Sequence, residues 1–325
     1  MKKYNWGIIG PGKIAAKFAK ALLNISNSEL IAVASRDKER AKLFANKYKA
    51  KRYYENYEAL ANDDKIDIVY IATPHTFHHR DVLLCLNNKK AVLCEKPMSV
   101  NYQSTLEMVT LARNNNVFLM EAMWTRFLPI IKETIRLIEI GKIGELKFVR
   151  ADFGFTFPFN PGSRIFDLKL GGGSLLDIGV YPLFLALQLL GEPDAIKSFA
   201  HLSVTGADES MNAMLYYKNK AMASVFSTVA ANTPVIAEIT GTDGCITIQS
   251  PWYKSSSLVL RKNNTEKKIS LPYGENGFEF EIEEVTNCLD NNLTESPALP
   301  LSFSLMMSKV VNEISNQCNL RYEVQ

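Results

Sequence analysis

The chain has 325 residues, of which 47% are hydrophobic and 22% charged, and its formal net charge is +3; this length is typical of two domains with ample cores. Because the charges are interleaved and nearly balanced, they indicate neither a nucleic-acid nor a membrane partner. The five cysteines show no CxxC pair and no metal-ligand spacing, so we expect no bound metal and free thiols in a reducing compartment. The sequence opens on an expected strand without an apolar signal segment or a run of 18 apolar residues, so we expect no signal peptide and a cytoplasmic location.

Up to Glu121, short apolar runs alternate with amphipathic segments. The expected strands are residues 6–9, 30–34, 66–72, 91–94 and 117–120, and the expected helices are 13–23, 38–48, 77–86 and 102–113. Strands that alternate with helices predict a doubly wound parallel sheet. We therefore expect an α/β Rossmann domain over residues 1–122.

The pattern changes after Glu121. A helix is expected at 129–139, strands at 146–155, 195–204, 211–217, 221–228, 237–240, 245–249, 258–261 and 268–271, and further helices at 180–190, 278–291 and 301–317. This predicts an α+β domain over residues 123–325 with a largely antiparallel, open-faced sheet, whose C-terminal helix packs back on the first domain. An uncovered sheet face needs a partner, which predicts a homodimer through this sheet.

Residues 10–15, Gly-Pro-Gly-Lys-Ile-Ala, follow the first expected strand and open the first expected helix. Gly10 permits a tight turn, Gly12 lets the backbone approach a pyrophosphate, and Ala15 lets helix and strand pack closely. The helix N-terminus then offers N–H groups and a positive dipole to the phosphates. The turn therefore predicts a dinucleotide site that includes Gly10, Gly12, Lys13 and Ile14.

The second expected strand ends in Ser35-Arg36-Asp37, where the adenosine ribose of a dinucleotide lies. An acidic residue at this tip favours NAD, but Ser35 and Arg36 occupy it here. An arginine stacks on adenine and pairs with a 2′-phosphate, so we predict NADP. NAD is the alternative, with Asp37 holding the ribose and Arg36 solvated.

Cys94-Glu95-Lys96-Pro97-Met98 follows the strand expected at 91–94. A carboxylate and an amine therefore lie at the carboxyl edge of the sheet, where ligands bind in such folds. A lysine beside a bound cofactor can donate to a substrate hydroxyl or help to deprotonate it. The alternative is a surface lysine in a turn.

Three motifs together resemble the glucose–fructose oxidoreductase and inositol dehydrogenase family: the turn at 10–15, Ala72-Thr73-Pro74-His75-Thr76-Phe77-His78, and Glu95-Lys96-Pro97. The resemblance covers essentially the whole chain. Residues 121–127 (EAMWTRF) and 171–181 (GGGSLLDIGVY) are most similar to the subgroup of dimeric dihydrodiol dehydrogenase and NADP-dependent D-xylose dehydrogenase. The resemblance implies an NADP-binding domain followed by a substrate-binding and dimerisation domain.

The resemblance implies catalytic roles for Lys96, Asp177 and Tyr181, and a cis Lys96–Pro97 peptide. Tyr181 stands where members similar to inositol dehydrogenase have histidine, which favours the dihydrodiol and xylose subgroup. The spacing agrees, because residues four apart on a helix share a face. An ammonium and a nicotinamide charge lower a phenol's pKa, so Tyr181 and Lys96 are expected to take the hydroxyl proton. The alternative is a core tyrosine and a capping aspartate.

The family resemblance also implies cofactor contacts from the loops that end the strands. The expected contacts, besides those of the turn, are Ser35, Arg36, Thr73, Pro74, His75, His78, Glu95, Lys96, Trp124 and Arg126. Trp124, Phe155 and Tyr181 are expected to meet the substrate, since an aromatic face suits a sugar ring or a diol ring equally. Domain-junction or core packing is the alternative for Trp124 and for the alternating phenylalanines at 153–159.

These observations predict an NADP-dependent oxidoreductase that transfers a hydride between a carbinol of a sugar or cyclic trans-diol and the nicotinamide. The alternative from another class is a non-catalytic dinucleotide-binding regulator or sensor of the same family. The presence of Lys96, Asp177 and Tyr181 favours the enzyme. The motifs identify neither the particular sugar or diol nor the physiological direction.

Overall fold

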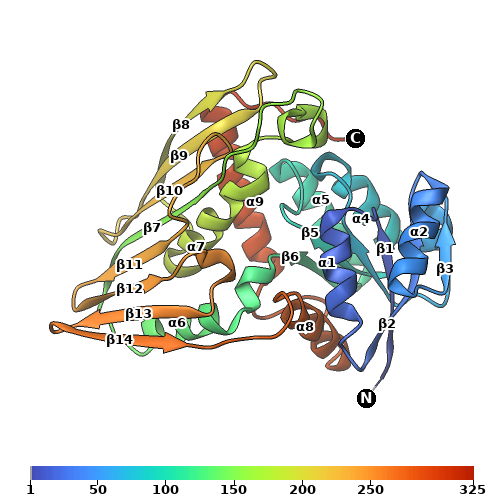
Figure 1. Cartoon of the computed structure of the whole chain (residues 1–325), viewed down its shortest axis with the longest axis horizontal. Helices are drawn as coiled ribbons and strands as arrows, with labels where there is room; N and C mark the ends of the chain where they lie inside the picture. Colours follow the sequence, from blue (N-terminus) through green and yellow to red (C-terminus); the bar gives the residue numbers. More distant parts are fainter. Residues whose placement is uncertain (1) are drawn as a thin grey trace. The chain divides into compact units, whose positions relative to one another are not determined.

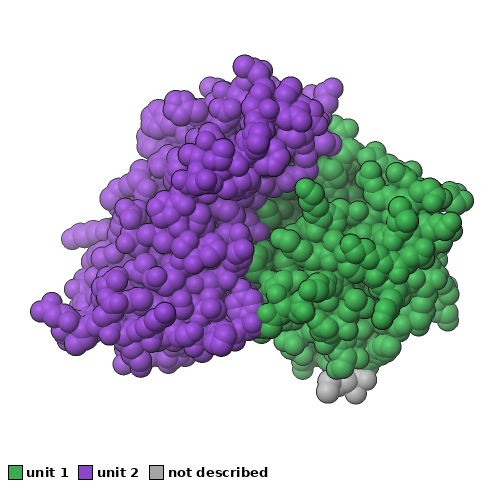
Figure 2. Space-filling view, viewed as in Figure 1, with its two compact units in different colours: residues 1–127, 274–308, 324–325 green, residues 128–273, 309–323 purple. Residues whose placement is uncertain are grey.

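The computed structural model describes residues 2–325, which form two compact units (Figure 2). Unit 1 comprises Met1–Phe127, Gly274–Ser308 and Val324–Gln325, and unit 2 comprises Leu128–Tyr273 and Lys309–Glu323. The division differs from the expected one at 122/123, because a late segment of the chain packs with the first unit.

Unit 1 contains a six-stranded, wholly parallel sheet in the order β3-β2-β1-β4-β5-β6. Its strands are β1 (Tyr4–Ile9), β2 (Ser28–Ala34), β3 (Arg52–Tyr54), β4 (Ile68–Ile71), β5 (Ala91–Glu95) and β6 (Leu119–Ala122). Its helices are α1 (Lys13–Leu22), α2 (Lys38–Tyr48), α3 (Tyr57–Ala61), α4 (His78–Asn87), α5 (Tyr102–Asn115) and α8 (Glu279–Asp290), with short turns η1 (His75–Phe77) and η2 (Trp124–Phe127). The predicted doubly wound sheet is confirmed.

Two short elements of unit 1 gave no sequence signal. Strand β3 is three residues long, lies at the sheet edge and carries the exposed Arg52 and Tyr53. Helix α3 follows it and is capped by Asn56, whose side chain accepts from the Ala59 N–H. Both are too short for periodicity to reveal them, since β3 has three residues and α3 has five, of which Leu60 and Ala61 are buried.

The late segment belongs to unit 1 through direct contacts. Helix α8 packs on α1 and η2, and Tyr4 donates to the Asp290 carboxylate at 2.7 Å. Leu301, at the start of α9 (Leu301–Gln317), is buried in the core of the parallel sheet. Within α9, residues up to Ser308 count with unit 1 and residues from Lys309 count with unit 2.

Unit 2 contains an eight-stranded sheet in the order β14-β13-β12-β11-β7-β10-β9-β8. The strands are β7 (Leu146–Gly154), β8 (Ala195–Leu202), β9 (Asp208–Tyr216), β10 (Met222–Thr228), β11 (Ala237–Gly241), β12 (Gly244–Ile248), β13 (Ser257–Lys262) and β14 (Thr265–Ser270). Neighbouring strands are antiparallel except for the parallel pair β7–β10, as the prediction of a largely antiparallel sheet requires.

Helices cover one face of this sheet. Helices α6 (Pro129–Glu139) and α7 (Val180–Leu190) and the second part of α9 lie along it (Figure 1). The segment Leu168–Leu190, which ends in α7, is long and apolar enough to span a membrane, but 78% of its most apolar window is buried. That burial is typical of a core helix.

The opposite face of the sheet has no helix of unit 2 over it in the described chain. Alternate residues of the strands project from it, so Phe199, Tyr216 and Met222 are exposed. Tyr216 lies opposite Met222 in the register of β9 and β10. The predicted open face is therefore present, and part of it is apolar.

Candidate active site

The turn between β1 and α1 lies at the carboxyl edge of the parallel sheet in unit 1. Gly10 has a φ of +86°, and a Cβ there would meet the backbone of Ala72 and Thr73 at 2.8 Å. Helix α1 starts at Lys13, and its N-cap residue, Gly12, makes no side-chain cap. The first N–H groups of the helix have no intrahelical partner. A Cβ on Gly12 would meet only the Gly10 carbonyl oxygen, at 4.0 Å.

Arg36 follows β2, and its guanidinium lies 5.2 Å from the centre of the Phe77 ring. Arg80 lies 4.9 Å from the same ring, so two guanidinium groups meet beside Phe77. Asp37 caps α2, and its carboxylate accepts from the Arg40 N–H at 3.0 Å. Ser35 accepts from the Asp37 N–H at 3.2 Å. Arg80 also pairs with the buried Asp81 at 2.7 Å, so the carboxyl groups of Asp37 and Asp81 accompany the guanidinium groups at this strand tip.

His78 ties together two of the motif loops. Its Nδ1 lies 2.9 Å from the Pro97 carbonyl oxygen, and its Nε2 lies 2.9 Å from the Thr73 carbonyl oxygen. A carbonyl oxygen only accepts, so both contacts are hydrogen bonds when both ring nitrogens carry protons. The Thr73 hydroxyl donates to the buried Asp81 at 2.8 Å. His75 is also buried, 5.7 Å from His78 between ring centres.

Lys96 directly follows the last residue of β5 and is buried. Its N–H donates to Glu95 Oε2 at 3.2 Å, and the Tyr70 hydroxyl donates to Glu95 Oε1. The Lys96–Pro97 peptide is cis, as the resemblance implied. A second carboxyl, Glu121 of β6, accepts from the Met98 N–H at 2.9 Å. Burial raises the pKa of Glu121, and the nearby Lys96 acts against that rise.

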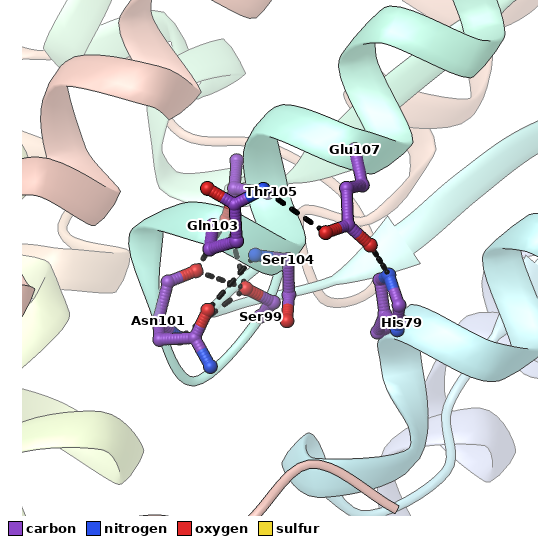
Figure 3. Close-up of polar contacts among 7 residues, drawn as sticks. All are labelled: His79, Ser99, Asn101, Gln103, Ser104, Thr105 and Glu107. Atoms are coloured by element: carbon purple, nitrogen blue, oxygen red, sulfur yellow. Dashed lines mark hydrogen bonds and ion pairs between the residues drawn. The ribbon is translucent and has the colours of Figure 1, made fainter.

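Polar contacts fix the turn that follows Lys96 and Pro97 (Figure 3). The Ser99 hydroxyl donates to the Asn101 carbonyl at 2.6 Å, and the Asn101 side chain caps α5 by accepting from the Ser104 N–H at 2.8 Å. Further along α5, the side chain of Glu107 lies 2.9 Å from His79 of α4. His79 thus contacts a surface carboxylate, whereas His78 contacts the two motif loops.

Trp124 in η2 packs against Phe278, the residue before α8. The two rings are stacked with centres 5.1 Å apart and planes 12° apart. Arg126 of the same turn donates from Nε to the Ala298 carbonyl at 2.9 Å. Phe278 lies far away in the sequence and was not among the expected site residues. Only the return of the chain through α8 brings it to Trp124.

In unit 2, the buried Asp208 fixes the loop at residues 171–174. One oxygen of that buried carboxyl accepts from the Ser174 hydroxyl and the Leu175 N–H, both at 2.7 Å. Gly173 has a φ of +117°, and a Cβ there would come within 2.0 Å of Asp208 Oδ1. Burial raises the pKa of Asp208 to about 6, and these hydrogen bonds limit the rise.

Asp177 and Tyr181 lie in two successive helical segments of unit 2. Asp177 lies in a π-helical segment, η5 (Leu175–Gly179), and Tyr181 lies in α7. In a π-helix the hydrogen bonds run from i to i+5, so the chain departs locally from α-helical geometry here. Asp177 pairs with Arg164 at 2.5 Å, a residue that the sequence did not single out.

Tyr181 lies in an aromatic cluster. Its ring centre is 5.5 Å from those of Phe153 and Tyr253, which stack on each other at 4.2 Å. Phe155 adjoins the cluster, 6.3 Å from Phe153. Strand β7 ends at Gly154, so the expected alternation of rings does not continue as a strand beyond it. Tyr253 follows a different strand and carried no sequence signal.

The residues of unit 1 fit a dinucleotide. Diphosphate oxygens need donors, and the uncapped start of α1 supplies them. The open space where a Cβ of Gly12 would lie is the cradle that such a group fills. The guanidinium pair at Phe77 suits a phosphate on the ribose. A dinucleotide would therefore be held by the turn at 10–14, by Arg36 and by the loop that contains Thr73.

Family models match both units. The model described as an oxidoreductase family with an NAD-binding Rossmann fold matches residues 4–123, and the model of the GFO/IDH/MocA C-terminal domain matches residues 131–247. The trans-1,2-dihydrobenzene-1,2-diol dehydrogenase of Xenopus tropicalis is 38% identical over 329 residues, which cover 98% of each chain. Together these matches cover both halves of the chain.

Two solved structures share the fold over nearly the whole chain. The 3-ketoreductase KijD10 from Actinomadura kijaniata, in complex with NADP and TDP-benzene, has a TM-score of 0.87 at 24% identity, with 98% of each chain covered. A levoglucosan dehydrogenase in complex with NADH and levoglucosan has a TM-score of 0.89 at 19% identity, also with 98% of each chain covered. At these identities the likeness concerns the fold.

The pKa of Asp208 predicts how stability varies with pH. The native carboxyl keeps its proton up to about pH 6, whereas the unfolded one releases it near pH 4. Asp208 therefore favours the folded state below pH 4, and about 3 kcal/mol is lost as the pH rises from 4 through 6. We expect Asp208→Asn to remove this slope, as measured by urea unfolding between pH 4 and 7.

The matched control is Glu209→Gln, which removes a neighbouring, less buried carboxylate. The control is expected to keep the wild-type pH dependence. If Asp208→Asn and wild type lose stability in parallel over this range, Asp208 is not protonated in the native protein.

Proposed function

Because the chain belongs to the GFO/IDH/MocA family of oxidoreductases, we propose that it is an NADP-dependent dehydrogenase that acts on a carbinol of a small cyclic trans-diol or sugar. The observation that carries this proposal is the arrangement in unit 1, where the uncapped start of α1 and the buried Lys96 lie at the carboxyl ends of β1 and β5, the two parallel strands on either side of β4. A dinucleotide held at this edge is within the same unit as a lysine that can manage a proton.

When bound, the cofactor supplies the hydride acceptor. The chain's own residues do the rest. The N–H groups at the start of α1 hold the diphosphate, and Arg36, with Arg80 beside it, holds a 2′-phosphate. The solved neighbours hold NADP in one structure and NADH in the other. NADP is therefore favoured by Arg36 and by the use of Asp37 as a helix cap.

Lys96 and Tyr181 take the substrate hydroxyl proton as the hydride leaves carbon. The Glu95 carboxylate and the cis peptide fix the backbone from which the lysine side chain starts. In unit 2, Asp177 accepts a hydrogen bond from a substrate hydroxyl, and its ion pair with Arg164 orients that carboxylate. The aromatic cluster of Phe153, Tyr181 and Tyr253 supplies a flat apolar contact for a ring.

A cyclic trans-diol is the favoured substrate class, because the 38% identical full-length relative is named for a trans-diol. The direct test is a panel of trans-diols and aldoses with NADP and with NAD, followed by absorbance of the reduced cofactor. NADP-dependent turnover with a diol or sugar supports the proposal. Tight NADP binding without turnover on the whole panel would instead favour a non-catalytic regulator.

The exposed apolar side chains of the unit 2 sheet support a homodimer. Phe199 is 80% exposed, and Met222 and Tyr216 are exposed on the neighbouring strands. A contiguous apolar patch on a sheet face is typical of an interface. The free cysteines fit a reducing compartment such as the cytoplasm.

Replacing Lys96 by Met removes the ammonium but keeps an unbranched side chain of similar length. We expect turnover to fall by about a hundred- to ten-thousandfold, the usual contribution of a general acid–base group. Titration of the variant with NADP should give a dissociation constant close to that of wild type. Turnover that stays at the wild-type level would contradict the role of Lys96.

Replacing Arg36 by Ala removes the expected partner of the 2′-phosphate. A charge-assisted hydrogen bond contributes roughly 1.5–3 kcal/mol, so NADP should bind about ten- to a hundredfold more weakly. NAD binding should change little, and Arg40→Ala, on the exposed part of the same segment, should change neither. If wild type itself prefers NAD, then Asp37 holds the ribose; Lys13 reaching the phosphate would reduce the effect.

Replacing Phe199 by Glu puts a charge on the exposed apolar face at the edge strand β8. Burying that charge in an interface is unfavourable, so we expect the variant to be monomeric where wild type is a dimer. Light scattering coupled to size exclusion measures both masses. The control is Leu43→Glu, since Leu43 is 67% exposed on α2 of unit 1. A monomeric wild type would overturn the dimer.

A further inference from the structure

Glu95, Glu121 and Glu281 are buried carboxyl groups of unit 1, and Glu281 differs from the other two. Glu95 accepts from the Tyr70 hydroxyl and the Lys96 N–H, and Glu121 accepts from the Met98 N–H and the Ser304 hydroxyl. Glu281 of α8 is 0% exposed, and neither of its carboxyl oxygens has a hydrogen-bond partner among the described residues. A buried polar group without a partner is rare and needs an explanation.

Helix capping does not explain Glu281. It is the third residue of α8, the position from which a glutamate can reach back to the N–H of the residue before the helix. Here the Phe278 N–H donates to Asn276 Oδ1 at 3.1 Å, and the Gly277 N–H donates to Glu279 at 2.9 Å. Other side chains accept from these N–H groups, and Glu281 is turned into the interior instead.

The charged side chain that acts on Glu281 is Glu95. Because Glu95 is itself acidic, it cannot stabilise a carboxylate at Glu281. Burial raises the pKa of Glu281 well above its usual range, and the Glu95 charge raises it further.

The elements packed on α8 are α1 and η2. Their cations are engaged elsewhere or exposed: Arg126 donates to Ala298, Lys20 pairs with Glu275, and Lys13 and Lys17 are exposed. On α8 itself, Glu283 is exposed, Glu284 accepts from Ser296, and Asp290 accepts from Tyr4.

We propose that Glu281 is a positioning residue that acts on Lys96 through Glu95: it remains a neutral carboxylic acid near Glu95, whose carboxylate accepts from the Lys96 N–H, so that no further carboxylate charge is added at this position. Ionising an unpaired, fully buried carboxyl is strongly unfavourable, and ionising it next to a second carboxylate is more so.

The neutral state of Glu281 matters for the chemistry of Lys96. An additional carboxylate near an ammonium raises the proton affinity of that ammonium. With Glu281 neutral, Lys96 holds its proton less tightly and exchanges it more readily with a substrate hydroxyl. This second step rests on the proposed function, since it needs Lys96 to transfer a proton, whereas the protonation of Glu281 does not.

Infrared difference spectroscopy tests the protonation directly in the full-length protein without added cofactor. The spectrum of wild type minus Glu281→Gln at pH 7 is expected to contain the C=O stretching band of a protonated carboxylic acid, shifted in heavy water. The matched control is Glu283→Gln, two residues along α8 and exposed, which should show carboxylate bands instead. A carboxylate band for Glu281 at pH 7 overturns the proposal.

The pH profile of turnover tests the coupling to Lys96. In wild type, ionisation of Glu281 at alkaline pH adds a carboxylate charge, which makes Lys96 hold its proton more tightly and so lowers kcat. Glutamine cannot ionise and cannot have this effect. We expect the alkaline fall in kcat of Glu281→Gln to lie about half a pH unit or more above that of wild type, with Glu283→Gln unchanged. Superimposable profiles of Glu281→Gln and wild type overturn the positioning role.

If no substrate is found, the free energy of unfolding still decides the protonation. A raised native pKa means that Glu281 contributes stability at low pH that is lost as the pH rises through that pKa. Glu281→Gln should therefore gain stability relative to wild type with increasing pH. A constant difference across the range overturns the proposal even when the proposed function has failed.

Discussion

The parallel direction of the strands in unit 1 is the constraint on which its candidate site depends. Parallel strands bring all their carboxyl ends to one edge of the sheet, so four segments far apart in the sequence end as neighbours there. That edge gathers polar backbone that no ladder satisfies, and side chains must complete it. His78 does so for two loops at once, through its contacts with Thr73 and Pro97. The chemistry of Lys96 is built on a backbone fixed in this way.

Unit 2 solves a different problem. Its catalytic candidates lie where a loop of glycines enters a helix, and such a loop has no conformation of its own. A single buried carboxyl, Asp208, fixes it by accepting from Ser174 and Leu175. A π-helical turn, Leu175–Gly179, follows directly and contains Asp177. Such turns are frequent at functional sites.

Much of this architecture was predictable, since buried strands and amphipathic helices carry their periodicity in the local sequence. The Rossmann turn, the parallel sheet and the mixed second unit follow from such patterns. What the sequence did not reveal depends on long-range pairing. Phe278 reaches Trp124, and Glu281 lies near Glu95, only because α8 returns to unit 1. In the sequence Glu281 looks like an ordinary glutamate in the first turn of a helix, and nothing local distinguishes it.

The division of the chain has a consequence for its synthesis. Unit 1 contains residues from both sides of unit 2, and the hydrogen bond from Tyr4 to Asp290 joins positions 286 residues apart. A ribosome adds about 5–20 residues per second, so the strands around β1 wait for many seconds before α8 exists. During this interval unit 2, whose 128–273 segment is already complete, is free to form most of its sheet. The nascent Rossmann sheet meanwhile lacks the helix that covers Trp124, and it is the part of this protein that a chaperone would be expected to shield.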